Sequence, residues 1–169
     1  FLAKVYNRII NQKWEVSFPK GLGAPEKISL TKLFSLHRHE DEGVKYFSGT
    51  ATYKTNFVVK PSMMSEDRVV FLDLGAVEVM AEVIVNGVNK GICWSRPYLI
   101  DVTDVLKPGE NTLEIKVTNQ WTNRLIGDEQ LPEENEYVPG GGVNGIAALS
   151  RGAIRKLPDW YRNGVNKPE

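Results

Sequence analysis

The residues best suited to chemistry lie together in residues 120–130, whose sequence is QWTNRLIGDEQ. Trp121 offers an aromatic face to the apolar side of a sugar ring, and Asn123 and Arg124 offer planar groups that hydrogen-bond neighbouring hydroxyls. Asp128 and Glu129 add carboxylate acceptors. Together these side chains are typical of a carbohydrate-binding surface. The alternative is structural: Trp121 packs in the core, Arg124 pairs with one of the two carboxylates, and the segment only docks on a neighbouring domain.

A second candidate surface is the turn at residues 94–98, with the sequence WSRPY. Trp94 and Tyr98 supply two aromatic rings and Arg96 a guanidinium, between two predicted strands. Loops at the ends of β-sandwiches commonly carry binding residues. The alternative for Tyr98 is that it begins the next strand and belongs to the core.

Two histidines superficially suggest a metal site. His37 and His39 would point to the same face of a strand, and carboxylates follow at residues 40–42. The spacing specifies no third ligand, so an exposed polar loop is the simpler interpretation. We assign no metal ligand.

Alternating apolar residues predict the strands that must position these segments. Val83 and Val85 share one face, and the Asn86-Gly87 pair that follows suits the positive φ angles of a two-residue hairpin turn. The predicted strands cover residues 14–18, 44–59, 68–74, 79–86, 88–93, 98–102 and 112–119, with weaker candidates at 28–30 and 33–36. After Trp121 no alternation is sustained, and we expect a long irregular segment.

This rhythm of short strands and turns predicts an all-β fold, a jelly-roll β-sandwich of two mainly antiparallel sheets. We expect one domain over residues 13–169, after a linker or short amphipathic segment at residues 1–12. The residues expected in its core are Trp14, Phe57, Phe71, Val83, Val85, Leu113, Ile115 and Val117.

Composition restricts the partners. The chain has 169 residues, and its 21 Lys and Arg balance 21 Asp and Glu, so no net field attracts nucleic acid. No stretch approaches the roughly 20 apolar residues of a membrane helix, so we expect no membrane insertion. Because the sequence starts at Phe1 without an initiator methionine, we expect a piece of a longer protein.

Several of these motifs also carry a family resemblance. The strings LDLG (72–75), VNG (85–87), DVT (101–103) and PGENTL (108–113) resemble the sugar-binding jelly-roll domain of glycoside hydrolase family 2. The flanking strings YFSGTATY (46–53) and NRLIGDEQLP (123–132) resemble the C-terminal, galactose-binding-like β-sandwich of α-L-rhamnosidases of glycoside hydrolase family 106. The families place a further strand after a Ser-Gly-Leu or Ser-Gly-Ile element, which we do not find, so the domain is either complete or without its last strand.

The resemblance implies a function for the whole chain. It implies a non-catalytic carbohydrate-binding or accessory domain of an exported bacterial glycoside hydrolase, secreted or periplasmic, with carbohydrate and the parent catalytic domain as partners. By position, Asp128 or Glu129 resembles the acidic residue with which family 2 reaches into its catalytic barrel. A structural calcium ion is known from such sandwiches, but no spacing here identifies its ligands. The alternatives are a purely structural packing module and a free-standing glycosidase.

No pair of carboxylates with a defined separation is evident from the sequence. Glycoside hydrolysis needs two carboxyl groups about 5–9.5 Å apart on opposite sides of the bond, and Asp128 and Glu129 are neighbours in one segment. We assign no catalytic residue and expect the isolated chain to show no turnover of aryl rhamnosides or galactosides. Robust activity that Asp128→Asn abolishes contradicts this expectation.

Overall fold

The computed structural model describes residues 8–65, 67–131, 136–138 and 153–156. The chain forms two compact units, Phe1–Arg124 and Leu125–Glu169. The strands are β1 (Trp14–Ser17), β2 (Lys27–Leu30), β3 (Thr50–Val59), β4 (Phe71–Asp73), β5 (Met80–Val85), β6 (Val88–Cys93), β7 (Leu99–Asp101), β8 (Gly109–Thr118), β9 (Glu136–Val138) and β10 (Ala153–Lys156). The helices are α1 (Glu42–Lys45) and α2 (Thr122–Glu129), with short 3-10 helices η1 (Leu36–Arg38) and η2 (Pro61–Met63).

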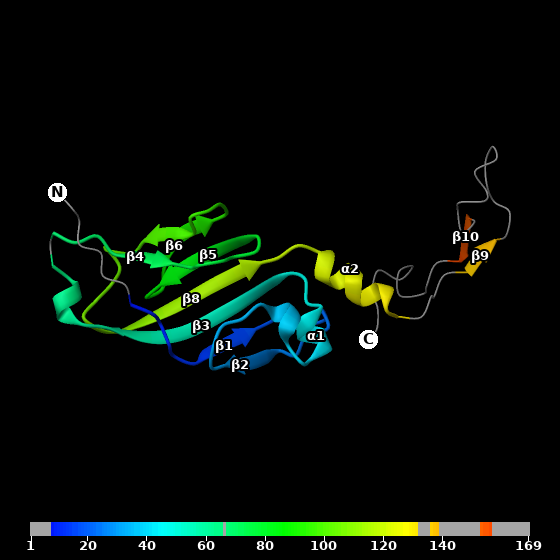
Figure 1. Ribbon diagram of the computed structural model, residues 1–169, viewed down its shortest axis with the longest axis horizontal. Helices are drawn as coiled ribbons and strands as arrows, with labels where there is room; N and C mark the ends of the chain where they lie inside the picture. The colour runs from blue at the N-terminus through cyan, green and yellow to red at the C-terminus, as the bar shows by residue number, and fades with distance from the viewer. Residues whose placement is uncertain (1–7, 66, 132–135, 139–152, 157–169) are drawn as a thin grey trace. The chain divides into compact units, whose positions relative to one another are not determined.

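The first unit is built on a six-stranded sheet with the order β2-β1-β3-β8-β5-β6 (Figure 1). Each strand runs antiparallel to its neighbours. The second layer is a two-stranded antiparallel sheet of β4 and β7. In the second unit, β9 and β10 pair with each other. The predicted all-β jelly-roll class with antiparallel sheets is confirmed.

The core lies where alternation predicts it. Ala81, Val83 and Val85 of β5 are buried, while Glu82 faces outward and its carboxylate pairs with Lys116 at 3.0 Å. This hydrogen bond lowers the pKa of the Glu82 carboxyl and raises that of the Lys116 ammonium. Of the predicted core residues, those that are buried are Trp14, Val83, Val85, Leu113 and Ile115, and those that are half-buried against the core are Phe57 and Val117.

The prediction that Phe71 belongs to the core is wrong, because its side chain is 57% exposed. It lies opposite Asp101 in the small sheet, on the face that also carries Asp73 and Leu99. The partly buried pair of that sheet is Leu72 and Ile100. The predicted alternation of side chains along β4 was correct. Within the described residues, however, this sheet has two strands and its outer face is open.

In two places a helix occupies residues that the sequence predicted to be strand. The strand predicted over residues 44–59 begins only at Thr50, because Asp41 caps the short helix α1 by accepting a hydrogen bond from the Val44 backbone N–H at 3.1 Å. The weak candidate at residues 33–36 is not a strand and leads into η1.

The segment after Trp121 is more regular than predicted. It contains the eight-residue helix α2 and then the paired strands β9 and β10. The predicted limit at residue 13 and the question of a missing last strand stay predictions.

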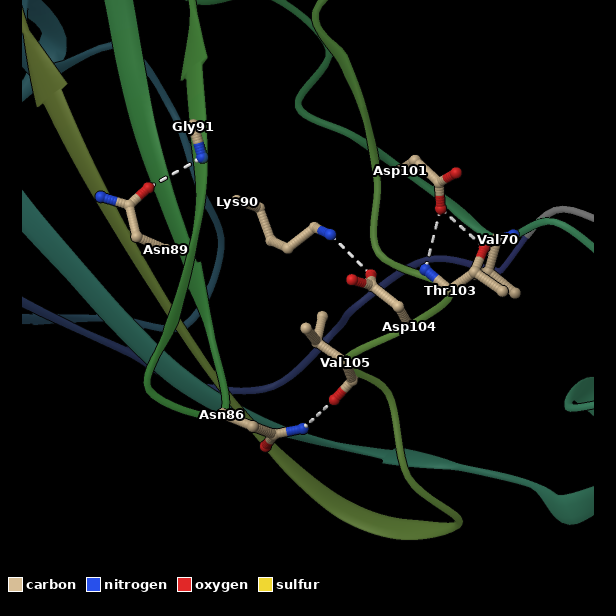
Figure 2. Close-up of polar contacts among 9 residues, drawn as sticks. All are labelled: Val70, Asn86, Asn89, Lys90, Gly91, Asp101, Thr103, Asp104 and Val105. Atoms are coloured by element: carbon tan, nitrogen blue, oxygen red, sulfur yellow. Dashed lines mark hydrogen bonds and ion pairs between the residues drawn. The ribbon is translucent and has the colours of Figure 1, made fainter.

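A buried amide network joins two turns of the sandwich. Asn111 is fully buried, and its Oδ1 accepts hydrogen bonds from Asn86 Nδ2 at 2.7 Å and from the Lys107 N–H at 2.9 Å. Its Nδ2 donates to the carbonyls of Lys107 and Gly109 at 2.8 and 3.0 Å. Asn86 Nδ2 also donates to the Val105 carbonyl at 2.8 Å (Figure 2). The network therefore ties the β5–β6 hairpin to the connection that leads into β8.

The hairpin turn has the predicted geometry. Asn86 and Gly87 have φ angles of 51° and 82°, both in the left-handed region. Asn86 Oδ1 accepts a further hydrogen bond from the Thr112 N–H at 3.0 Å, so this residue both forms the turn and binds β8.

A smaller polar motif fixes the chain after β7. Asp101 Oδ1 accepts hydrogen bonds from the backbone N–H and the hydroxyl of Thr103, whose oxygen in turn accepts from the Val70 N–H at 2.8 Å (Figure 2). These bonds lower the pKa of the Asp101 carboxyl. Close by, the Lys90 ammonium pairs with Asp104 and lowers the pKa of that carboxyl.

We expect Asn111→Ala to destabilise the chain by about 3 kcal/mol, because it leaves several buried backbone groups without partners. Asn56→Ala is the matched control. Asn56 is an exposed amide on the neighbouring strand whose Nδ2 donates to Glu110, so its loss should cost less than about 0.5 kcal/mol. Urea unfolding of both variants measures the difference, and equal midpoints contradict the prediction.

Candidate functional site

The two candidate segments leave the large sheet at the same end. Thr118, the last residue of β8, lies opposite both Thr50 and Met80, the first residues of β3 and β5. Because β5 runs antiparallel to both β6 and β8, these two strands finish together, at what we call the β6/β8 end (Figure 1). Residues 94–98 follow β6 and residues 121–124 follow β8. The topology thus brings the two predicted segments to one end of the first unit.

The tryptophans of the two segments are open to solvent. Trp94 is 73% and Trp121 is 70% exposed. The alternative that placed Trp121 in the core is therefore wrong. Tyr98 is only 9% exposed and joins the hydrophobic core, as the structural alternative for that residue predicted.

The segment after β8 is anchored to the chain before β3. Asn119 Oδ1 accepts a hydrogen bond from the Gly49 N–H, and its Nδ2 donates to the Phe47 carbonyl, both at 2.8 Å. The buried Ser48 hydroxyl accepts from the Arg124 N–H at 3.0 Å. This bond satisfies one of the N–H groups that the first turn of a helix leaves open, so Ser48 acts as a cap from 76 residues away.

Helix α2 carries the other predicted site residues. Asn123, Arg124 and Asp128 are half-buried, and Glu129 is exposed. Arg124 and Asp128 lie about one turn apart on the same helix face. Asp128 and Glu129 are consecutive in the helix and project about 100° apart, so they do not converge on one point.

The turn at residues 94–98 is held from both sides. The Leu74 N–H donates to the Tyr98 carbonyl at 2.9 Å, and the Leu99 N–H donates to the Pro97 carbonyl at 2.8 Å. Cys93, directly before the turn, is buried, and burial raises the pKa of its thiol. It packs as a small apolar residue.

A shallow open hollow of about 500 Å³ lies beside this turn. It is lined by Asp73, Gly75, Ala76, Arg96, Pro97 and Tyr98. Sequence reasoning named the Arg96 guanidinium in the candidate turn but did not single out Asp73. The register that sets Asp73 opposite Leu99, directly after the turn, brings the carboxylate to the hollow. The string LDLG, which contains Asp73, was noted in the sequence only as a family motif and not as a source of a binding residue.

The histidines have local structural roles. His37 Nδ1 hydrogen-bonds the Ser35 hydroxyl at 2.8 Å, and His39 Nδ1 accepts from the Asp41 N–H at 3.0 Å. The His39 ring also stacks on Phe34 with 6.1 Å between the ring centres. In the part of the chain that the structure describes, no group of three or more His, Cys, Asp or Glu side chains is arranged to hold a metal ion.

Comparison with known families identifies the domain. Residues 34–161 match the family described as the glycosyl hydrolase 2 galactose-binding domain-like family. The chain belongs to this family. Among the described residues, no helix is long and apolar enough to cross a membrane.

Relatives of this galactose-binding-like domain are much longer proteins. A Formosa agariphila protein named "Putative beta-glucuronidase" is 43% identical over 92% of the chain. The solved rhamnosidase from Novosphingobium sp. PP1Y is 44% identical over 79% of the chain, with a TM-score of 0.71. A solved β-glucuronidase from Ruminococcus gnavus is 20% identical over 70%, with a TM-score of 0.57, and shares the fold. The chain spans 12%, 13% and 23% of these proteins, respectively.

We expect Ser48→Ala to loosen the start of α2. The Arg124 N–H then loses its acceptor, and a lost helix cap typically costs about 1 kcal/mol, or about fivefold in amide protection. Hydrogen exchange of the α2 amides measures this effect, with Ser29→Ala, an exposed serine on β2, as the control. A loss of protection spread evenly over the large sheet contradicts a local role for Ser48.

Proposed function

We propose that this chain is the accessory domain of a larger, rhamnosidase-like glycoside hydrolase, and that it helps to frame the active site of the catalytic domain. Its family and the small share of each relative that it covers support this proposal. The carboxylates that cleave the bond then belong to the rest of the parent enzyme. A secreted or periplasmic location stays a prediction.

The observation that carries the proposal is the exposure of Trp121 at the β6/β8 end. A tryptophan that is 70% exposed contributes little to the core, whereas its flat apolar face suits the C–H side of a sugar ring. The hydrogen bonds of Asn119 and Ser48 hold the chain on both sides of it. The indole is thus presented from an anchored segment rather than from a free loop.

The chain itself is poorly suited to hydrolysis. The two acidic candidates, Asp128 and Glu129, follow each other in α2, so they do not face each other across a bond. We therefore assign Trp121, Asn123 and Arg124 of the first unit to contact with carbohydrate, and we assign Asp128 and Glu129 of the second unit no part in bond cleavage.

We propose that the parent enzyme is an α-L-rhamnosidase of glycoside hydrolase family 106. The solved rhamnosidase is 44% identical to this chain over the region that matches, against 20% for the solved β-glucuronidase. The relative from Formosa agariphila, at 43%, is named for the other activity, so the substrate has to be measured.

Structural docking is the second candidate function, and one observation favours it. Leu125 and Ile126 are exposed apolar side chains that follow each other on α2. Exposed apolar residues of this kind are common where one domain packs on another. On this view α2 fastens the module to the catalytic domain of the same protein.

The decisive experiment replaces Trp121 with alanine in the full-length parent enzyme. If the indole frames the active site, kcat/KM on a rhamnosidic oligosaccharide should fall about tenfold, which corresponds to about 1.4 kcal/mol. Phe71→Ala is the matched control, because Phe71 is an exposed aromatic residue on the outer face of the small sheet. It should leave kcat/KM unchanged.

The same enzyme distinguishes the docking function. Replacing both Leu125 and Ile126 with serine should lower the melting temperature of the parent enzyme if α2 packs on its catalytic domain. Unchanged kcat/KM in Trp121→Ala, together with such a loss of stability in the double variant, rejects framing of the active site in favour of docking.

A further inference from the structure

We propose that the hollow beside the 94–98 turn is a separate subsite for a neutral sugar ring that carries adjacent hydroxyl groups. The hollow is formed by residues other than those of the Trp121 segment. The proposal rests on the proposed function only in that both surfaces take carbohydrate.

The hollow offers hydrogen-bond donors without internal partners. Arg96 is exposed, and the structure gives its guanidinium no hydrogen bond or ion pair with any described residue. A guanidinium presents five N–H donors in a planar fork, which matches two adjacent oxygen atoms.

The hollow also offers a positioned acceptor. Asp73 Oδ1 accepts a hydrogen bond from the Gly75 N–H at 2.8 Å, which orients the carboxylate. Gly75 has a φ angle of 67°, in the left-handed region that glycine adopts without strain. Asp73 Oδ2 has no donor among the described residues and is left for a ligand hydroxyl.

The combination of charges selects a neutral ligand. An anionic sugar drawn to Arg96 would bring its carboxylate close to the Asp73 carboxylate in the same hollow, where like charges repel. A hydroxyl group both accepts and donates, so a pair of hydroxyls can satisfy the guanidinium and the carboxylate together. Pro97 and Ala76 supply apolar surface for the C–H groups of the ring.

The two polar groups are held by neighbouring backbone. The hydrogen bond from the Leu74 N–H to the Tyr98 carbonyl joins the residue after Asp73 to the turn that carries Arg96. The buried Tyr98 fixes that turn to the core. Because β4 and the turn are joined in this way, little order has to be gained when a ligand binds.

Titration of the 169-residue chain followed by two-dimensional ¹H–¹⁵N NMR tests the subsite. The probes are methyl α-L-rhamnopyranoside and methyl galactopyranoside, with glucuronate as the charged comparison. We expect shifts of the Gly75, Ala76, Arg96 and Tyr98 amides with a Kd of about 1–10 mM, typical of an open site for one sugar.

Three variants sharpen the result. Asp73→Asn keeps an oxygen for the Gly75 N–H but removes the charge, and Arg96→Lys keeps the charge but removes the planar fork. Each should weaken binding about tenfold. The control Arg38→Gln removes an exposed arginine of η1, outside the hollow, and should bind as the unmodified chain does. An unchanged chemical shift of the Leu74 amide in the sugar-free variant shows that the turn keeps its structure.

Several outcomes overturn the subsite. The subsite is overturned if Asp73→Asn or Arg96→Lys binds the neutral sugars with an unchanged Kd. It is also overturned if no amide chemical shift changes at 100 mM sugar. Tighter binding of glucuronate that Asp73→Asn strengthens identifies an anion site instead. Chemical-shift changes confined to Trp121 and α2 reject the subsite and support the proposed function. Chemical-shift changes confined to the hollow support the subsite and argue against the proposed role of Trp121.

Discussion

The sandwich depends on one buried side-chain amide. Asn111 lies near the start of β8, and both polar atoms of its side chain are hydrogen-bonded. The partners are Asn86 and the backbone of Lys107 and Gly109. A buried amide tolerates few arrangements, because an unmade hydrogen bond in a low-dielectric interior is costly. Its partners therefore fix where β8 starts relative to the β5–β6 hairpin. Strand β8 lies between β3 and β5, so its placement sets the register of the sheet's centre and the position of the β6/β8 end.

Local patterns made most of the fold predictable. Alternation located the strands, and the Asn86-Gly87 pair located a turn that requires positive φ at both positions. Alternation shows which residues share a face of a strand but not whether another layer covers that face. Phe71 was therefore predicted to lie in the core, although its face of the small sheet is open. Helix α2 escaped prediction for a different reason. Its start is hydrogen-bonded to Ser48, 76 residues earlier, and a contact over that separation leaves no local pattern around Thr122 in the sequence.

The candidate site was predictable only in part. Residue chemistry singled out both segments, and strand order brings them to the same end of the sheet, which a list of residue types does not reveal. Tyr98 proved to be a core residue that supports its turn, and Trp121 proved to be exposed. The hollow was missed because Asp73 and Arg96 come from two strands' ends that are 23 positions apart. Their proximity follows from the pairing of β4 with β7.

The anchoring of the segment after β8 has an evolutionary consequence. Its hydrogen bonds go to residues 47–49, whereas the turn that holds Arg96 is bonded to Leu74 and the core. The two surfaces thus lie at one end of the sheet, but the hydrogen bonds described above that anchor one surface are different from those that anchor the other. Mutations that reshape one surface leave the supports of the other unchanged. If both surfaces bind carbohydrate as proposed, such modularity allows a lineage to adapt to a new glycan one surface at a time.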